Sequence, residues 1–152
     1  MTRRPPTTCR RLASVAARSS GRPPSLHDRL GHAPLHANPV FAEFLQRFGA
    51  LAATAESDDD IAGKARLFWF TVEFGLIREA GAVKVYGSGL ISSHDDAANA
   101  LGPVCERRPF SLDEVLTQPF AIDRLQAVLF VVESFDQLVA AVEEARARLG
   151  LG

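Results

Sequence analysis

One stretch decides the fold of this chain: Leu67-Phe68-Trp69-Phe70-Thr71-Val72-Glu73-Phe74-Gly75-Leu76-Ile77. It is the most apolar and most aromatic segment of the sequence, yet a carboxylate, Glu73, lies at its centre. If the stretch is helical, the residues one turn before and after Glu73 are all apolar, so no Lys or Arg is placed to form a surface ion pair with it. An ionised carboxylate among such neighbours is costly unless a positive group or a bound metal compensates it. The alternative is that Glu73 lies at the edge of the apolar face and reaches water.

The length and composition indicate one globular domain. The chain has 152 residues, of which 47% are hydrophobic and 23% charged, and its net charge is −1, which suffices for one sizeable core. No apolar run approaches the length of a membrane span, so we expect no membrane association. Cys9 and Cys105 have neither metal-type spacing nor the pairing of a disulfide framework, which favours a reducing, cytoplasmic location.

The N-terminal segment differs in charge from the rest of the chain. Residues 1–36 carry seven Arg and one Asp, whereas the remainder holds ten Lys or Arg against seventeen acids. A start without acids is typical of an organelle transit peptide, but it also fits a disordered tail or a wrongly assigned translation start. No aromatic residues are interleaved with the arginines, so a nucleic-acid partner is not expected. We therefore separate residues 1–22, a disordered or unrelated segment, from a domain at 23–152.

Capping residues and apolar spacing predict a mainly α-helical fold with small β hairpin and strand pieces. A helix is expected to begin at Asn38-Pro39 and to end or loosen at Gly49. A central helix is expected to begin after Ser57 and to run through the 67–77 stretch. The other expected elements are a short helix from Leu26 after Ser25, a short hairpin or extended excursion at 81–89, short helices after Ser92-Ser93 and Ser111, a strand at 127–132 and a helix at 135–149.

Two histidines offer partners for Glu73. His27 and His32 are five residues apart and would diverge by about 140° on a continuous helix. They can converge only if the helix ends between them, which Gly31 and Pro34 make plausible. Two imidazoles and one carboxylate leave open positions on a metal, an arrangement typical of non-haem Fe(II) oxygen chemistry, although the same ligands can hold catalytic zinc. The zinc interpretation lacks a His-Glu-x-x-His motif, and surface or structural histidines remain the simpler alternative.

Four motifs follow one another along the chain. They are His27-Asp28-Arg29-Leu30-Gly31-His32 with Pro34-Leu35, Thr71-Val72-Glu73-Phe74-Gly75-Leu76, Tyr86-Gly87-Ser88-Gly89-Leu90-Ile91-Ser92-Ser93, and Val132-Glu133-Ser134-Phe135. In this order and spacing they resemble the pterin-dependent aromatic amino acid hydroxylases, and the aspartate after the first histidine looks like the bacterial phenylalanine 4-hydroxylases. The resemblance runs from about Pro23 to near Ala141 and covers the later half of that family's catalytic core.

The resemblance implies part of the hydroxylase catalytic fold and an iron- and tetrahydropterin-dependent monooxygenase. Its substrates would be O₂ and L-phenylalanine, which becomes L-tyrosine. The chain shows no tetramerisation segment that would imply an oligomer. The alternative is a truncated, inactive relative that retains iron binding only. The implied site residues are, for Fe(II), His27, His32 and Glu73; for the substrate, Pro23, Trp69, Phe74, Gly89 and Ser92; and for the tetrahydropterin, Asp28, Ala65, Phe68 and Phe120.

The chain also departs from the family. The earlier half of the family's core, which carries the pterin-stacking loop and the arginine that binds the substrate carboxylate, has no counterpart here, and Arg29 takes a usually apolar position. Loss of half a core would expose apolar faces such as Phe41, Phe44 and Phe48, so aggregation or partner-dependent folding is expected.

Overall fold

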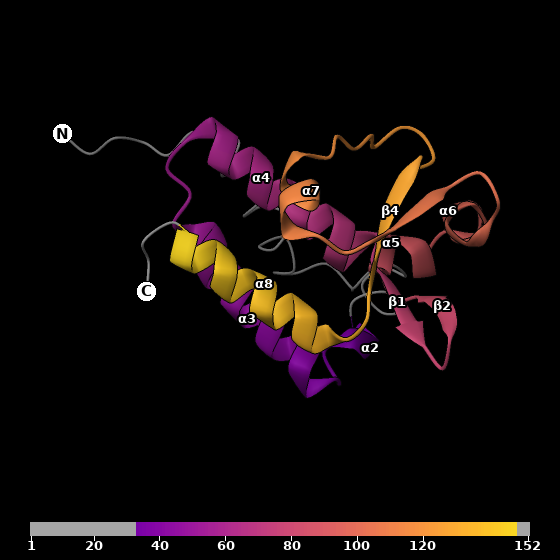
Figure 1. Ribbon diagram of the computed structural model, residues 1–152, viewed down its shortest axis with the longest axis horizontal. Coiled ribbons are helices and arrows are strands. Elements are labelled where there is room, and N and C mark those ends of the chain that lie inside the picture. Colours follow the sequence, from indigo (N-terminus) through magenta and orange to yellow (C-terminus); the bar gives the residue numbers. More distant parts are fainter. Residues whose placement is uncertain (1–32, 149–152) are drawn as a thin grey trace, which may run out of the picture.

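The computed structural model describes residues 33–148 and confirms a mainly helical chain with small β pieces (Figure 1). The helices are α2 (Ala33–Leu35), α3 (Pro39–Ala53), α4 (Asp58–Phe68), the π-helical turn η2 (Trp69–Glu73), α5 (Ser88–Ile91), α6 (His94–Leu101), α7 (Leu112–Thr117) and α8 (Phe135–Arg148). The strands are β1 (Leu76–Glu79), β2 (Ala82–Val85), β3 (Glu106–Pro109) and β4 (Val128–Val132). No helix among these residues is long and apolar enough to cross a membrane. The N-terminal segment and the helix expected from Leu26 lie outside the described residues.

The four strands form one mixed sheet in the order β2-β1-β4-β3. The hairpin pair β1 and β2 is antiparallel, whereas β4 runs parallel to both β1 and β3. The apolar run of β4 is almost entirely buried, as expected for a central strand with parallel neighbours. The hairpin turns at Ala80 and Gly81, both with positive φ, which is the geometry of a tight two-residue turn. The expected hairpin therefore exists, but it begins earlier in the chain than predicted.

The central helix is shorter than predicted. Regular α-helix ends at Phe68, one π-turn follows, and Leu76 already belongs to β1. The π-turn is closed by the Phe74 N–H, which donates to the Trp69 carbonyl at 2.8 Å. The Gly75 carbonyl then accepts the N–H of Tyr86, so the chain enters the sheet. Leu76 and Ile77 are thus paired with residues of the neighbouring strands β2 and β4. The prediction that they form the next helical turn after Glu73 was wrong.

Helices α3 and α8 lie side by side (Figure 1). Phe41 and Phe44 are fully buried and Phe48 nearly so, which corrects the expectation that these rings are exposed. The helix also continues past Gly49 to Ala53, contrary to prediction. A helical glycine costs roughly 0.5–1 kcal/mol, less than the burial of the large apolar side chains on the same helix contributes.

The predicted capping residues are confirmed. Each accepts a hydrogen bond from a backbone N–H in the first turn of its helix, which satisfies a donor that the helix itself cannot pair. The capping residues are Asn38 for α3, Ser57 for α4, Ser93 for α6 and Ser111 for α7.

Candidate active site

Glu73 is the last residue of the π-turn, and a close approach of backbone segments holds it. A Cβ added at Gly87 would lie 2.4 Å from the Glu73 carbonyl oxygen, and one at Gly89 would lie 2.9 Å from the same atom. Only glycines allow the start of α5 to pack so closely on Glu73. Gly89 was predicted as a site residue, whereas Gly87 was missed although the Gly-Ser-Gly spacing of its motif signals a close backbone approach.

Two serines reinforce this contact. The Ser88 hydroxyl is fully buried and donates to the Val72 carbonyl at 3.2 Å. Ser92, a predicted substrate residue, is exposed at the end of α5, where its hydroxyl donates to the Ser88 carbonyl at 2.7 Å. Ahead of Glu73, the Thr71 hydroxyl donates to the Leu67 carbonyl at 2.5 Å. Hydrogen bonds from both sides therefore fix the backbone that presents the Glu73 carboxylate. Single π-turns inside helices occur frequently at functional sites.

Three of the predicted aromatic residues form one stack. The Trp69 ring lies 4.6 Å from that of Phe74 at an interplanar angle of 22°, and 4.6 Å from that of Phe120 at 19°. Phe120 comes from the segment between α7 and β4, so the tertiary fold brings it onto the π-turn. The indole Nε1 is buried and has no hydrogen-bond acceptor in the described part of the chain. This stack is an aromatic wall beside Glu73.

The other predicted residues have different positions. Ala65 and Phe68 lie on α4, about two turns and about one turn before Glu73 respectively. Phe68 packs against Phe48 with ring centroids 5.8 Å apart. Pro23, His27, Asp28 and His32 lie outside the described residues. The structure thus brings Trp69, Phe74 and Phe120 together and leaves Phe68 in a separate aromatic contact.

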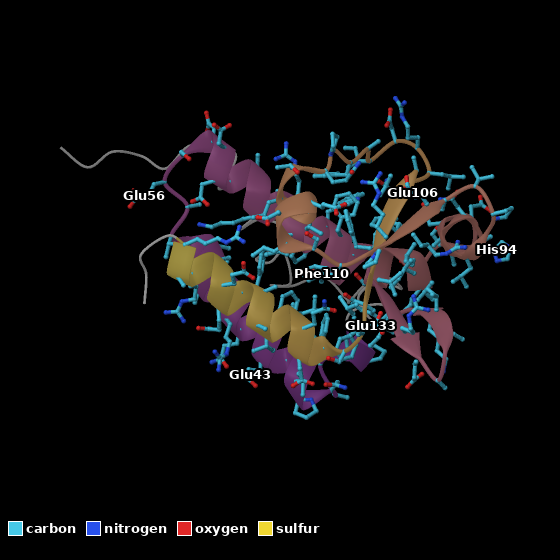
Figure 2. The ribbon with its side chains drawn as sticks, in the orientation of Figure 1. Glu43, Glu56, His94, Glu106, Phe110 and Glu133 are labelled. Atoms are coloured by element: carbon cyan, nitrogen blue, oxygen red, sulfur yellow. The ribbon has the colours of Figure 1, made fainter. Side chains whose placement is uncertain are left out.

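Within residues 33–148, no three His, Cys, Asp or Glu side chains lie close enough to hold a metal ion. Glu73 is the member of the predicted ligand set that this region contains. The two histidines within residues 33–148, His36 and His94, are both exposed. Figure 2 shows His94 at the margin of the molecule on α6. Neither histidine joins Glu73 in a metal site, so a three-ligand site requires histidines from residues 1–32.

A cavity of about 390 Å³ adjoins Trp69 and Phe74. Its other walls are the start of α6, with Asp95 and Asp96, and the loop of residues 121–126. This lining was missed in the sequence, where the two aspartates serve equally well as first-turn acids of a helix. Only the tertiary structure places their carboxylates beside the aromatic wall.

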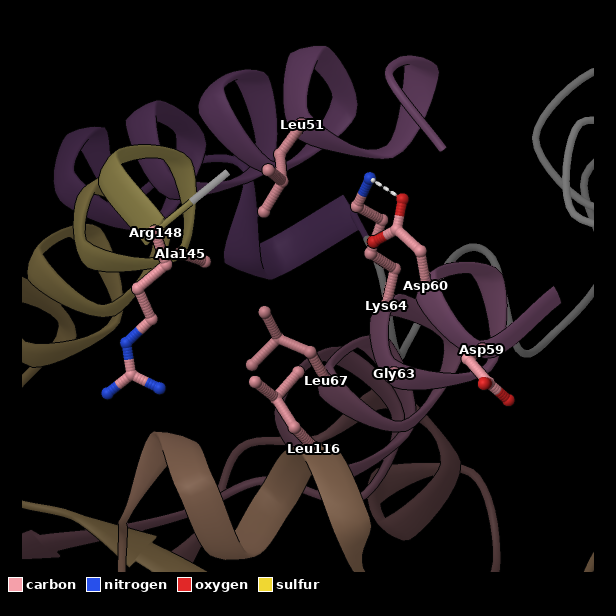
Figure 3. A pocket seen from close by; sticks show the side chains of 9 residues that line it. All are labelled: Leu51, Asp59, Asp60, Gly63, Lys64, Leu67, Leu116, Ala145 and Arg148. Carbon is pink, nitrogen blue, oxygen red and sulfur yellow. Dashed lines mark hydrogen bonds and ion pairs between the residues drawn. The ribbon is translucent and has the colours of Figure 1, made fainter. Parts of the chain in front are cut away.

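A second cavity, of about 220 Å³, lies between α3, α4, α7 and α8 (Figure 3). Its apolar lining includes Leu51, Leu67 and Leu116. The nearly buried Lys64 donates to Asp60 at 2.8 Å and to Thr54 at 3.2 Å. Because this lysine is already paired within the protein, the cavity reads as a packing space between helices rather than a second polar site.

Comparison with known proteins gives this arrangement a context. The family model described as biopterin-dependent aromatic amino acid hydroxylase matches residues 10–149. Tyrosine 3-monooxygenase of Drosophila melanogaster is 43% identical over 114 residues, which are 75% of this chain and 20% of that protein. Phenylalanine-4-hydroxylase of Ralstonia nicotianae is 38% identical over 120 residues, which are 78% of this chain and 38% of that protein.

Solved structures show the same relationship. Chromobacterium violaceum phenylalanine hydroxylase with bound oxidised Fe(III) has a TM-score of 0.77 and 37% identity, over 81% of this chain and 45% of that one. A structure of the same enzyme with iron(III) and 7,8-dihydrobiopterin has a TM-score of 0.73 and 36% identity, over 82% of this chain and 46% of that one. The chain spans less than half the length of these relatives. It belongs to the biopterin-dependent aromatic amino acid hydroxylases.

Proposed function

We propose that this chain is an iron- and tetrahydropterin-dependent monooxygenase that converts L-phenylalanine to L-tyrosine with O₂ in the cytoplasm. The observation that carries the proposal is the aromatic wall of Trp69, Phe74 and Phe120 beside Glu73, in a chain of this family. The iron(III) and dihydrobiopterin bound by the Chromobacterium violaceum enzyme support the choice of cofactors.

His27, His32 and Glu73 would hold the iron. One carboxylate oxygen and two imidazole nitrogens are suitable ligands for Fe(II) and leave coordination positions open for O₂. When bound, iron and tetrahydropterin together supply the oxidising chemistry. The protein's own contribution is to hold Glu73 on a backbone fixed by Gly87 and Gly89.

The remaining proposed residues divide between substrate and pterin. Flat aromatic side chains can position a flat substrate ring by stacking and exclude water from the reacting atoms. The proposed substrate residues are Pro23, Trp69, Phe74, Gly89 and Ser92, and the proposed pterin residues are Asp28, Ala65, Phe68 and Phe120.

Phenylalanine and tyrosine are the two candidate substrates. The wall of Trp69, Phe74 and Phe120 is apolar apart from one indole N–H, which favours the unsubstituted ring of phenylalanine. The relatives include tyrosine 3-monooxygenases at slightly higher identity. Protein supplied with Fe(II), tetrahydropterin and either amino acid should form tyrosine from phenylalanine faster than 3,4-dihydroxyphenylalanine from tyrosine. The reverse order would assign the chain to tyrosine.

The second candidate is a truncated, inactive relative that binds iron only. The observation behind it is that the chain spans less than half the length of its relatives. Iron content and pterin oxidation separate the candidates, because an inactive relative would retain iron but oxidise no pterin and form no tyrosine.

Variants test the ligand set independently of turnover. His27→Ala, His32→Ala and Glu73→Gln should each lower bound iron, whereas His36→Ala, which removes an exposed histidine, should not. Unchanged iron content in the first three variants would refute the ligand assignment.

A further inference from the structure

The cavity between α3, α4, α7 and α8 has apolar walls around about 220 Å³ of space. Figure 3 shows the side chains of Leu51, on α3, and Leu67, on α4, pointing toward one another across it. The ammonium of Lys64, which also lines the cavity, is engaged by Asp60 and Thr54. Apolar walls around an open space lose both burial and dispersion contacts, so a side chain that filled the space would stabilise the fold.

The cavity lies where α8 reaches its last turn. Ala145 and Arg148, which are both among the lining residues, belong to that turn. The guanidinium of Arg148 is paired with Asp113 and Glu144, which keeps its charge at the surface. Ala145 is buried, but its single methyl group fills little of the space. The apolar residues that follow directly in the chain are those of Leu149-Gly150-Leu151.

Helical spacing directs Leu149 toward the cavity. Leu138 and Val142 form the buried face of α8, and both side chains are fully buried. Position 149 comes eleven and seven residues after them, so one more helical residue brings it within about 20° of both. Helical side chains also tilt toward the N-terminus of their helix, so a side chain at position 149 covers the surface over Ala145. Ala145 is itself part of the cavity wall.

Gly150 gives Leu151 a route to the same wall. A glycine just past the end of a helix commonly takes the left-handed conformation, and the residue after it then makes an apolar contact with the last helical turn. With Gly150 in this role, that contact joins Leu151 to Arg146 or Ala145. Both leucines therefore converge on the end of the cavity that α8 contributes.

We propose that the segment Leu149-Gly150-Leu151 docks on this cavity and fills it with leucine side chain. The space is sufficient, since an apolar cavity of about 150 Å³ already admits a benzene molecule. The walls include Gly63 and Lys64 of α4, and this helix continues into the π-turn of Glu73. The docked segment thus supports the helix that leads to the proposed iron ligand. The inference concerns the packing of this chain and stands independently of the proposed reaction.

Thermal unfolding of the full-length protein, followed by circular dichroism, tests the docking. The C-terminal variant combines Leu149→Ala with Leu151→Ala. The matched control combines Leu101→Ala with Leu125→Ala, which removes two half-exposed leucines that lie outside this cavity. The C-terminal variant should lower the unfolding midpoint by about 5 °C or more, because it empties a cavity, whereas the control should change it by less than about 2 °C. Equal midpoints of the two variants would refute the docking.

A substitution in the cavity wall locates the docked side chain. Ala145→Leu adds apolar volume to the same space. In wild type it should lower the midpoint, because the space is already filled and becomes overpacked. In the C-terminal variant it should raise the midpoint, because it refills an emptied cavity. A change of the same sign in both backgrounds would overturn the proposal. Leu149→Ala alone, a milder change, gives the same comparison if the C-terminal variant does not unfold cooperatively.

Discussion

The ring of Tyr86 occupies the space that a side chain on Gly75 would need. A Cβ added at Gly75 would lie 2.1 Å from Tyr86 Cζ and 2.3 Å from the Thr71 carbonyl oxygen. The backbone of the same pair is joined, because the Tyr86 N–H donates to the Gly75 carbonyl at 3.1 Å. This contact closes the chain between the π-turn that carries Glu73 and the first strand of the sheet.

Gly75→Ala is therefore expected to lower the free energy of unfolding by about 3 kcal/mol, because neither the ring nor the Thr71 carbonyl can move aside easily. Urea unfolding followed by circular dichroism measures the change. Gly49→Ala is the matched control: a Cβ there meets nothing within 4 Å, and its helix should gain roughly 0.5–1 kcal/mol. A Gly75→Ala protein as stable as wild type would contradict the close contact.

Tyr86 is expected to make stability depend on alkaline pH. Its hydroxyl is buried and has no hydrogen-bond partner among residues 33–148, and burial raises the pKa of Tyr86 far above its usual value of 10.0. The unfolded chain ionises near pH 10 while the folded protein keeps the proton. The stability contribution is thus complete below pH 10 and is lost as the pH rises further.

Tyr86 is also the chain's single tyrosine, so absorbance at 295 nm follows its ionisation without interference from another phenol. No phenolate should form in the folded protein near pH 10, and Tyr86→Phe should remove part of the alkaline loss of stability. Ionisation of the native protein with an ordinary pKa would show that the hydroxyl reaches water.

Phe120→Ala should change the environment of Trp69, since it removes one of the two rings stacked on the indole. The expected loss of stability is about 1–2 kcal/mol, because the Phe120 ring is only half buried. Phe44→Ala, which removes a fully buried ring, should cost roughly 3–5 kcal/mol. The Trp69 emission maximum of folded protein should shift in Phe120→Ala and stay unchanged in Phe44→Ala.

Asp60→Asn should be more harmful than Lys64→Met. Lys64 is 5% exposed, and Asp60 is its ionic partner at 2.8 Å, so replacing this carboxylate by an amide leaves the buried ammonium beside neutral acceptors, the amide oxygen and the Thr54 hydroxyl. The expected loss is about 3 kcal/mol. Methionine at position 64 removes the charge and stays within about 1 kcal/mol of wild type, since the neighbouring cavity is apolar. Thermal unfolding ranks the two variants, and equal stabilities would contradict the paired, buried lysine.

Most of the elements could be predicted from the sequence because their signals are local. Asn38, Ser57, Ser93 and Ser111 each cap the helix expected of them, since a short side-chain oxygen satisfies the first-turn N–H groups wherever the chain lies. The apolar, β-branched run near residue 130 became the central strand for an equally local reason.

Two predictions failed where distant residues compete with local ones. Gly49 did not end its helix, because burial of the neighbouring Phe48 and Leu51 against the core outweighs the glycine's cost. Leu76 looked helical from its spacing, yet it pairs with Val85 on one side and Val131 on the other. Helical periodicity and strand burial give the same apolar pattern over a few residues, and only strand partners distinguish them.

The sequence by itself determined the family, the helix caps and the acidic residue in an aromatic segment, because these depend on residue type and short-range order. Only the tertiary structure decided that Glu73 ends a π-turn packed against Gly87 and Gly89, and that Phe120 stacks on Trp69. It also decided that Asp95 and Asp96 line the cavity beside Trp69. These relationships join residues up to about fifty positions apart. Their geometry follows from how helices pack on the sheet, which no spacing along the chain encodes.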